Sequence, residues 1–400
     1  MEPSGPLLGI RVLDLSGASG LHCSKLFADL GADVIKIERP GGDSSRNSPP
    51  FKDDQPGINR SLHFLHFNAN KRGVTLDLTK NYGPTLFRKL AATADVVLET
   101  FSPGQLESLG IGYSSLKEIN PRIVVTSVTP FGHRGPYKDF RATDIVSFAM
   151  GGLMALSGEP DRPPCVAPGE VAYGMASAFA ALGTLVAVYH SRLTGEGQQV
   201  DTSTHASSVH IAGYAVPVYS ATGHKGFRKT WAERTFDIND LYPCTDGYVR
   251  FCVLPKAQWD SMVDWLGSPD ILTSPVFADQ QFRRENSEII DPYVLGLTES
   301  QHKNDIYVEG QRRHIAVTPV NTPQDFVESQ QTEARGIFSS VYHPVMGEYK
   351  HFGPVHQFSE TPGAIHRSAP LVGEHNHEVF CGELGLSIHQ LSILTASGVI

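Results

Sequence analysis

The chain has 400 residues, of which 40% are hydrophobic and 19% charged, and its formal net charge is −9 at pH 7. Single cores usually stop growing near about 250 to 300 residues, so this length predicts two domains, or one large domain that carries an insertion. The negative charge and the lack of a basic run exclude a general nucleic-acid binder, which needs concentrated Lys and Arg to neutralise phosphates.

The cysteines and the apolar segments favour a cytoplasmic protein that does not contact a membrane. The five cysteines are odd in number, widely scattered and form no CxxC pair, which disfavours a disulfide scaffold or a zinc site. The N-terminus has no basic region followed by an apolar one, so no secretory signal is expected. The most apolar window, residues 175–189, is shorter than the roughly 20 residues of a membrane span, which predicts a buried core helix instead.

Strand-like and helix-like segments alternate in the N-terminal half. Residues 10–15 are short, β-branched and apolar, as in a buried strand, and residues 21–30 carry apolar side chains at helical spacing. With a second strand at residues 33–38 they form a βαβ unit, which implies a parallel strand pair. The same patterns predict strands at residues 73–78, 95–99 and 123–127 and helices at residues 82–92 and 106–109. The alternation predicts an α/β fold with an open, mostly parallel sheet.

Loops rich in Gly, Pro, Ser or Thr follow four of these predicted strands, at residues 16–20, 39–43, 100–104 and 129–135. In open parallel sheets ligands bind at the carboxyl ends of the strands, so these loops are candidates for a ligand-facing rim. Loops of this composition also occur where nothing binds, so each loop taken alone leaves both interpretations open.

The C-terminal half begins with a long helix, predicted at residues 174–192, and continues through a short strand at 200–203 and a helix at 205–215. The composition then becomes polar and basic at residues 220–237, which indicates an exposed connection. The segments beyond it favour a smaller α-rich domain from which the chain returns to the first domain. They are a hairpin at 241–254 with its turn at Asp246-Gly247, a helix at 259–266, helix-prone residues 268–315, a Pro-rich link at 317–323, strands at 337–342 and 348–351, and an extended tail at 361–373 that precedes a final helix.

Eight motifs spread over nearly the whole chain carry a resemblance to a known family. They are GIRVLD from Gly9, LFADLGADVIKIERPGGD from Leu26, FNANKRGVTLDL from Phe67, ADVVLETFSPG from Ala94, LGIGYSSLKEINPRIVVTSVTPFGHRGPY from Leu109, TGEGQQVD from Thr194, YPCTDGYV from Tyr242 and APLVGEHNHEVF from Ala369. Each motif alone is a weak signal. Eight in the family's order make the chain similar to the class III CoA-transferases, also called the carnitine dehydratase/bile-acid-inducible (CaiB/BaiF) family.

This resemblance implies both an architecture and an activity. The fold would be a Rossmann-like large domain, residues 1–220 with a returning tail at residues 326–400, and a smaller inserted domain at residues 225–325. Members of the family form dimers of two interlocked ring-like chains, with active sites between the large and small domains. They move CoA from an acyl-CoA donor, for example succinyl-CoA, to a carboxylic acid, so CoA thioesters are substrates and no separate cofactor is implied.

The resemblance also implies which residues contact CoA, whose phosphates need cations and backbone N–H groups. The matching positions are Arg39, Lys71, Arg72, Thr100, Phe101 and Gly104. The family's CoA-lining turn usually has Asn-Phe followed by a basic residue, whereas this chain has Thr100 at the Asn position and Ser108 near the basic one. The alternative for Arg39 and Arg72 is a solvated position at the rim, where Lys and Arg are common.

The nucleophile of the family is missing at its usual place. Class III transferases attack the thioester with an Asp that stands about 21 to 22 residues before the Thr of the TG-x-GQ motif. Counting back from Thr194 reaches Ala172 or Tyr173, and no Asp or Glu occurs in residues 171–195. The nearest carboxylate is that of Glu170.

Three hypotheses account for this absence. In the first, the helix start is displaced and the longer side chain of Glu170 takes over as nucleophile, although a misplacement of about 1 Å can cost about 100-fold in rate. In the second, the chain is the Asp-lacking subunit of a heteromeric transferase and pairs with a homologous Asp-bearing sister, as in two-subunit transferases that act on succinate-type acids such as benzylsuccinate. In the third, the scaffold carries another activity. The His-Asp pair of the family's racemases is Thr143-Asp144 here, which disfavours racemisation and leaves a lyase or an acyl-CoA-binding protein.

Other residue patterns indicate no further chemistry. His375 and His377 form an HxH pair, but no carboxylate or Cys is recognised at ligand spacing and the pair falls in the family's tail motif, so no metal site is expected. Asp144 is predicted to be a structural hydrogen-bonding carboxylate. Residues 16–20 hold no GxGxxG motif, so nicotinamide dinucleotide binding is unsupported. We expect a CoA-transferase subunit whose partners are an acyl-CoA, a carboxylic acid and either the sister chain or a second copy of itself.

Overall fold

The computed structural model describes residues 5–158, 161–211, 213, 215–226, 240–253 and 255–400. The chain divides into two compact units, and each is described by itself. The large unit comprises Met1–Met154, Val166–Val216 and Glu333–Ile400, and the small unit comprises Ala155–Cys165 and Pro217–Thr332.

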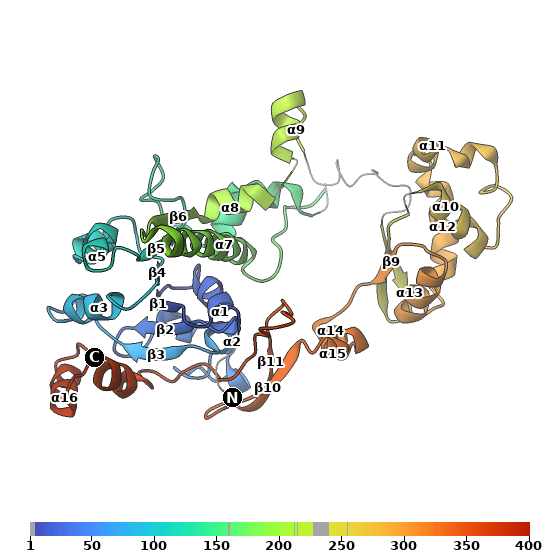
Figure 1. Cartoon of the computed structure of the whole chain (residues 1–400). Helices are drawn as coiled ribbons and strands as arrows, with labels where there is room; N and C mark the ends of the chain where they lie inside the picture. Colours follow the sequence, from blue (N-terminus) through green and yellow to red (C-terminus); the bar gives the residue numbers. More distant parts are fainter. Residues whose placement is uncertain (1–4, 159–160, 212, 214, 227–239, 254) are drawn as a thin grey trace. The chain divides into compact units, whose positions relative to one another are not determined.

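A six-stranded parallel sheet lies at the centre of the large unit (Figure 1). Its order, β3-β2-β1-β4-β5-β6, is that of the doubly wound dinucleotide-binding folds. The strands are β1 (Arg11–Leu15), β2 (Asp33–Glu38), β3 (Arg72–Thr75), β4 (Val96–Glu99), β5 (Val124–Thr129) and β6 (Gln199–Ser203). Every neighbouring pair is parallel, which confirms the predicted Rossmann-like α/β fold.

The strands from β1 to β5 are buried almost throughout, whereas the edge strand β6 is partly exposed. Burial on both faces explains the apolar residues at the centres of β1, β2, β4 and β5. The helices that cover the faces are α1 (Leu21–Asp29) and α7 (Val171–Thr194) on one side, and α3 (Gly83–Ala91) and α5 (Tyr113–Ile119) on the other. Side chains alternate between the faces along each strand, so Val12 of β1 packs with α1 and α7, whereas Leu13 packs with α3 and α5. The last residue of the chain, Ile400, joins the core of Leu13.

The other elements of the large unit lie in its loops and in the returning tail. They are 3₁₀ turns at Ser44–Asn47 and Lys52–Asp54, α2 (Leu62–Asn68), α4 (Gln105–Ser108), α6 (Asp144–Met150), α8 (Thr204–Ile211), β10 (Phe338–His343), β11 (Gly347–Phe352), a π-helical segment at His377–Glu383 and α16 (Ile388–Ala396). The tail is fixed on β3. The Gly73 N–H donates to Nδ1 of His375 at 3.1 Å, and the Thr75 N–H donates to Oδ1 of Asn376 at 2.8 Å. His375 of the HxH pair is therefore a structural contact.

Helix α7 begins directly after Glu170 and has 24 residues. Its face of small residues packs against α1 and the sheet, where Ala176, Ala180 and Thr184 are fully buried. By length and composition alone α7 is apolar enough to cross a membrane, and 44% of its most apolar window is buried inside the structure. The packing identifies it as the predicted core helix, although it starts at Val171 rather than at residue 174.

Two glycines after α7 explain the TG-x-GQ motif. Gly195 has φ = 80°, the left-handed conformation that ends many helices and that residues with a Cβ rarely adopt. The Gly197 N–H donates to the carbonyl of Pro121 at 2.8 Å, and a Cβ on Gly197 would lie 1.9 Å from the carbonyl oxygen of Ile123. The chain can therefore enter β6 close to β5 only because residue 197 has no side chain.

The small unit contains an antiparallel sheet of order β7-β8-β9 and helices packed around one core. Its elements, with those at its boundaries, are a 3₁₀ turn at Met154–Leu156, α9 (Ala215–Thr222), β7 (Leu241–Cys244), β8 (Gly247–Phe251), α10 (Lys256–Trp265), a 3₁₀ turn at Pro275–Ala278, α11 (Gln280–Glu285), α12 (Ser287–Thr298), α13 (Lys303–Arg312), β9 (Val317–Pro319), α14 (Pro323–Val327) and α15 (Gln330–Ala334). The predicted hairpin is present as β7 and β8, although residue 254 lies outside the described residues, as do residues 227–239 of the predicted connection.

The Pro-rich link predicted at residues 317–323 is wrong in its first part. Residues 317–319 form β9, which pairs with β8 through Val317 and Phe251. A proline at the end of an edge strand removes no hydrogen bond from the ladder, so Pro319 is compatible with this pairing.

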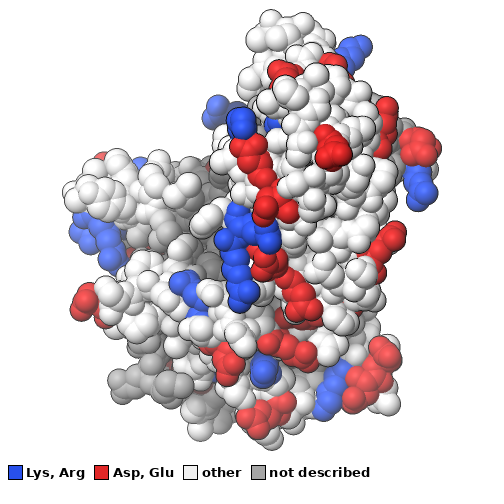
Figure 2. Space-filling model, turned by 90° about the vertical axis from the view of Figure 1, so that its right-hand side faces the viewer, with Lys and Arg blue, Asp and Glu red and all other residues white. Residues whose placement is uncertain are grey.

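The face drawn in Figure 2 carries basic side chains beside acidic ones. The small unit contains such pairs, for example Arg313 with Asp264 at 2.7 Å and with Glu309 at 2.8 Å. Charges of both signs that are mixed in this way cancel at a distance, unlike the single-sign stripe of a nucleic-acid interface.

We expect Gly197→Ala to lower the free energy of unfolding by about 3 kcal/mol, because its methyl group would overlap a backbone oxygen that no rotamer change can move. Gly174→Ala is the matched control. Gly174 lies within α7 and a Cβ there would meet no atom within 4 Å, so a gain of up to about 1 kcal/mol is expected. Urea denaturation followed by circular dichroism measures both variants, and equal stability of Gly197→Ala and wild type would contradict the close approach of the two strands.

Candidate functional site

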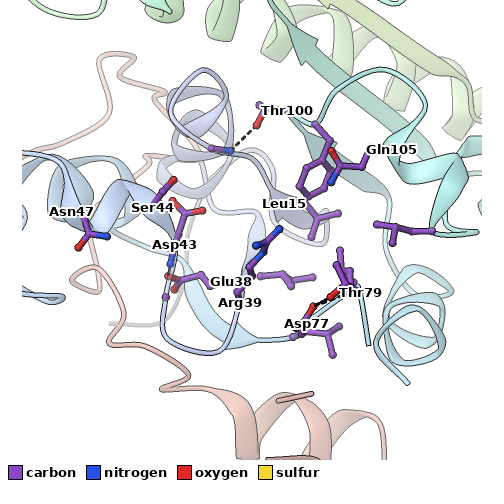
Figure 3. Close-up of a pocket in the computed structure, with 17 residues that line it drawn as sticks. Leu15, Glu38, Arg39, Asp43, Ser44, Asn47, Asp77, Thr79, Thr100 and Gln105 are labelled. Carbon is purple, nitrogen blue, oxygen red and sulfur yellow. Dashed lines mark hydrogen bonds between the residues drawn. The ribbon is translucent and has the colours of Figure 1, made fainter. Parts of the chain in front are cut away.

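An open cavity of about 450 Å³ lies at the carboxyl ends of β1, β2 and β4, beside the loop that follows β3 (Figure 3). The strand order reverses here between β1 and β4, which is the place where doubly wound sheets bind ligands. Its apolar wall is formed by Leu15, Ile37, Leu76, Leu78, Phe101 and Leu109, and its polar wall by Glu38, Arg39, Asp43, Ser44, Asn47, Asp77, Thr79, Thr100 and Gln105. A ligand with a flat apolar ring and a polar chain would find complementary walls on both sides.

Arg39 is the cation that this cavity offers to a ligand. Within the described part of the chain its guanidinium makes no hydrogen bond or ion pair, and Figure 3 shows the side chain extending from the end of β2 into the cavity. Contact of Arg39 with the anionic part of a nucleotide stays a prediction from the sequence.

The neighbouring Glu38 is not free to bind a ligand. The Arg46 guanidinium donates to both carboxylate oxygens, from Nε to Oε2 at 2.6 Å and from Nη2 to Oε1 at 2.7 Å. Arg46 is itself buried and lies over the ring of Phe64 at 3.7 Å. In dinucleotide-binding sheets an acidic residue near the second strand accepts a ribose hydroxyl. The buried ion pair removes Glu38 from that role.

The turn after β4 brings two more predicted residues into the cavity. The Thr100 hydroxyl oxygen accepts the Gly17 N–H at 2.8 Å, which joins the loops after β1 and β4 where the strand order reverses (Figure 3). Phe101 lines the cavity from the same turn. Gly104 does not line it, and instead has φ = 84° at the start of α4, where it lets the turn enter the helix.

Lys71 and Arg72 do not line the cavity. Lys71 is fully buried, and its ammonium donates to Oδ2 of Asp14 at 3.0 Å and to Oγ of Ser24 at 2.7 Å. Burial lowers the pKa of Lys71 to about 8, although the attraction of Asp14 opposes this shift. Arg72 forms ion pairs with Asp33 of β2 and with Glu378 and Glu383 of the returning tail. Both cations are thus occupied by internal carboxylates.

The start of α7 carries no carboxylate at the position where the sequence motif predicts one. Ala172 is fully buried and Tyr173 is half-buried. The Tyr173 N–H donates to Oδ1 of Asp144 at 2.9 Å, so Asp144 caps this helix end from α6. Burial raises the pKa of Asp144, whereas the hydrogen bond from Tyr173 lowers it and the charge of Glu170 raises it further. The geometry agrees with the structural role predicted for Asp144.

Glu170 lies just before α7 and is paired with His63 of α2. Nε2 of His63 is 2.9 Å from Oε2 of Glu170, and the imidazole packs on the ring of Phe67 with the ring centroids 4.8 Å apart. Nδ1 of His63 is buried without a hydrogen-bond partner among the described residues. A proton on Nδ1 would therefore be unsatisfied, so we assign the proton to Nε2, which donates it to Glu170.

Glu170 and the cavity are separate features of the large unit. The Ser177 hydroxyl of α7 donates to the carbonyl of Ser19 at 3.0 Å, in the loop that also contributes Gly17 to the cavity. Glu170 stands seven residues before Ser177, which is about 10 Å along the helix axis. A ligand held in the cavity must extend along this end of α7 to reach Glu170.

Several polar residues of the site were not predicted from the sequence. Asp77, Thr79 and Gln105 line the cavity, and the only available signal was that Asp77 lies near the end of a predicted strand and Thr79 directly after it. No sequence pattern marked His63 as part of the site, because its partner, Glu170, lies 107 residues further along the chain. Within the described residues no group of three His, Cys, Asp or Glu side chains is placed to hold a metal ion.

Comparisons with known proteins agree with one another. A family model described as CoA-transferase family III matches residues 7–376. The chain is 33% identical over 396 residues to the succinyl-CoA:(R)-benzylsuccinate CoA-transferase subunit BbsE of Thauera aromatica, with 95% of each protein covered. It is 33% identical over 409 residues to the succinyl-CoA–D-citramalate CoA-transferase of Chloroflexus aurantiacus, with 100% of this chain and 99% of that protein covered. The crystal structure of a CaiB/BaiF family protein from Brucella suis is similar with a TM-score of 0.86 and 28% identity, over 95% of this chain and 99% of that one.

Arg46→Ala should lower the free energy of unfolding of the large unit by about 3 to 5 kcal/mol, because it leaves the buried Glu38 carboxylate without its cation. The double variant Glu38→Gln/Arg46→Met removes both charges and should lose less stability than Arg46→Ala alone. Urea denaturation monitored by fluorescence measures both losses. A loss of stability in the double variant that equals or exceeds the loss in Arg46→Ala would contradict a coupled buried ion pair.

Proposed function

The chain belongs to CoA-transferase family III, and from this premise we propose that it is the Asp-lacking subunit of a heteromeric CoA-transferase. The reaction moves CoA from an acyl-CoA donor to a carboxylic acid. Succinyl-CoA is the proposed donor, because the names of both curated relatives contain it, and a succinate-type carboxylic acid is the proposed acceptor. CoA thioesters enter as substrates, and no other cofactor is required.

The observation that carries this proposal is the composition of the start of α7. No Asp or Glu occurs from Val171 to Thr194, and Ala172 is fully buried. The nearest carboxylate in the sequence, that of Glu170, precedes the helix and is bound by His63, and the Asp144 carboxylate at this helix end is bound by the Tyr173 N–H. The similarity to BbsE, which is named as a subunit of its enzyme, supports the same division between two chains.

The homologous sister chain would supply the nucleophile. Its Asp carboxylate attacks the donor thioester, which releases CoA thiolate and forms a mixed anhydride. The thiolate then attacks the Asp carbonyl, which frees the donor acid and leaves CoA as a thioester of the Asp. The acceptor acid takes up CoA by the same steps in reverse. This chain offers no carboxylate at the matching position for the first step.

The proposed assembly is an interlocked dimer of two ring-like chains, here made of this chain and its sister. Support comes from an exposed stripe on α7, in which Leu182, Val186, Tyr189 and Leu193 recur at helical spacing and are 58% to 69% exposed. An apolar stripe of this kind is surface that contact with another chain would bury. We also place the protein in the cytoplasm, where thiols stay reduced, because its five cysteines are unpaired.

A second candidate is a self-sufficient transferase in which Glu170 is the nucleophile. One observation favours it: His63 holds one oxygen of the Glu170 carboxylate, and the side chain is still 39% exposed. A nucleophilic carboxylate requires such an arrangement, with a donor that orients it and an oxygen that remains accessible. Its displacement by two or three residues from the usual position weighs against this candidate.

The two candidates give opposite results in a transfer assay with succinyl-CoA and a succinate-type acid. We expect the chain alone to transfer no CoA, and the chain mixed with a homologous Asp-bearing sister to transfer it. Glu170→Gln should leave the mixed activity within about twofold of wild type, and replacement of the sister's Asp by Ala should abolish it. Activity of the chain alone that falls at least about 100-fold in Glu170→Gln would instead identify Glu170 as the nucleophile.

Arg39→Gln should weaken the binding of CoA to the full chain about tenfold or more, because a hydrogen bond to a charged group contributes about 1.5 to 3 kcal/mol. Isothermal titration calorimetry at fixed salt concentration measures the change. Arg192→Gln is the matched control, since it removes the same charge from an exposed position near the end of α7. An equal loss of affinity in both variants would contradict a direct contact of Arg39 with the ligand.

A further inference from the structure

A buried carboxylate, Glu99, comes immediately before the turn that supplies Thr100 and Phe101 to the cavity. Glu99 is the last residue of β4 and is 2% exposed. Its Oε2 accepts the Phe101 N–H at 2.6 Å, so one side of the carboxylate fixes the backbone of the turn. None of the steps of CoA transfer described above uses this group.

The other side of the Glu99 carboxylate faces groups from the next loop and strand. Ser127 of β5 is opposite Glu99 in the strand pairing, and Nε2 of His133 is 4.0 Å from Oε1 of Glu99. Nε2 of His133 is buried and has no hydrogen-bond partner in the described part of the chain. The backbone N–H of His133 donates to Oδ2 of Asp201 in β6 at 2.9 Å. The Glu99 carboxylate therefore binds the turn after β4 and lies beside His133 of the loop after β5 without a hydrogen bond to it.

Burial, with a smaller contribution from neighbouring charges, brings the pKa of Glu99 close to neutral pH. The titratable side chains near it are Glu107 of α4, Tyr113 of α5, His133 of the loop after β5 and Asp201 of β6. Burial raises the pKa of Glu99 to about 7, and the charges of Glu107 and Asp201 raise it as well, whereas the Ser127 hydroxyl and the accepted backbone N–H lower it. Tyr113 is occupied, because its hydroxyl donates to the carbonyl of Gly197 at 2.8 Å.

We propose that Glu99 is a positioning residue for the cavity: its ionised carboxylate, set between the Phe101 amide and His133, holds the turn in the conformation that binds CoA. The inference depends on the proposed function only in taking CoA as the ligand. Protonation of Glu99 removes its negative charge, so the hydrogen bond that the Phe101 N–H donates to it loses its charge assistance and weakens. The proton passes between Glu99 and solvent, and no bond to the ligand forms or breaks.

Binding of CoA should then strengthen as the pH rises through neutrality. If only the ionised form of Glu99 is competent, the apparent affinity follows the ionised fraction. With a pKa of about 7, that fraction rises about tenfold between pH 6 and pH 8. The affinity increases with pH, rather than decreasing, because a carboxyl group gains its negative charge as the pH rises.

Isothermal titration calorimetry of the full chain with CoA, from pH 6 to pH 8, tests this inference. Wild type and Glu118→Gln, a control that removes an exposed acid from α5, should both show the tenfold gain. Glu99→Gln should show only the dependence due to the phosphate of CoA, which is common to all variants. Identical profiles for wild type and Glu99→Gln would overturn the inference.

A measurement without ligand separates this inference from the proposed function. Hydrogen exchange of the amides in residues 100–104, corrected for the intrinsic effect of pH, should slow above pH 7 in wild type and stay constant in Glu99→Gln. If the chain binds no CoA at any pH, the assignment of the cavity fails while the exchange result still decides the role of Glu99. Protection of these amides that is independent of pH in wild type would overturn that role even if CoA binds.

Discussion

The close packing of α7 on the parallel sheet is the constraint on which both parts of the candidate site depend. The helix can approach the strands because its buried face consists mainly of Ala, Ser and Thr, and the Thr184 hydroxyl lies 2.7 Å from that of Thr126 in β5. After the helix, Gly197 passes a carbonyl oxygen at a distance that no Cβ would tolerate. These contacts fix the height of α7 above the sheet. The same contacts therefore hold Ser177 against the loop after β1, and they place Glu170 about two helical turns away from Ser177.

Buried ion pairs hold the loops at the carboxyl ends of the strands. Asp14 accepts from Lys71 and from the backbone N–H of Ser16, which anchors the loop after β1, and Arg46 binds Glu38 at the end of β2. Burying such charges costs free energy that pairing does not always return, so these pairs are not simply a source of stability. Breaking one of these pairs would leave a buried charge without a partner. The shape of the cavity rim therefore depends on a few specific contacts.

The sequence predicted the fold more completely than the site, and the reason is physical. The strands β1, β2, β4 and β5 are buried on both faces and contain apolar runs, so they were visible as patterns, and Asp246-Gly247 marked the hairpin by its turn chemistry. β9 was missed because it has three residues and ends in a proline. No such local pattern in the sequence indicates which partner a side chain will bind. Arg39 and Lys71 look alike in the sequence, yet one is free in the cavity and the other is bound to an Asp 57 residues away.

The same separation allows this scaffold to lack a carboxylate within the first turns of α7 and keep its fold. The cavity is lined by residues from Leu15 to Leu109, whereas the catalytic carboxylate of the family belongs to the start of α7. Ala172 at that start is buried in the core, and Asp144 caps the helix end from outside, so the helix does not need an acid of its own there to begin. Replacing the family's Asp therefore removes chemistry without removing a structural contact. In the heteromer that we propose, this chain supplies the frame of the transferase and the sister chain supplies the reactive group.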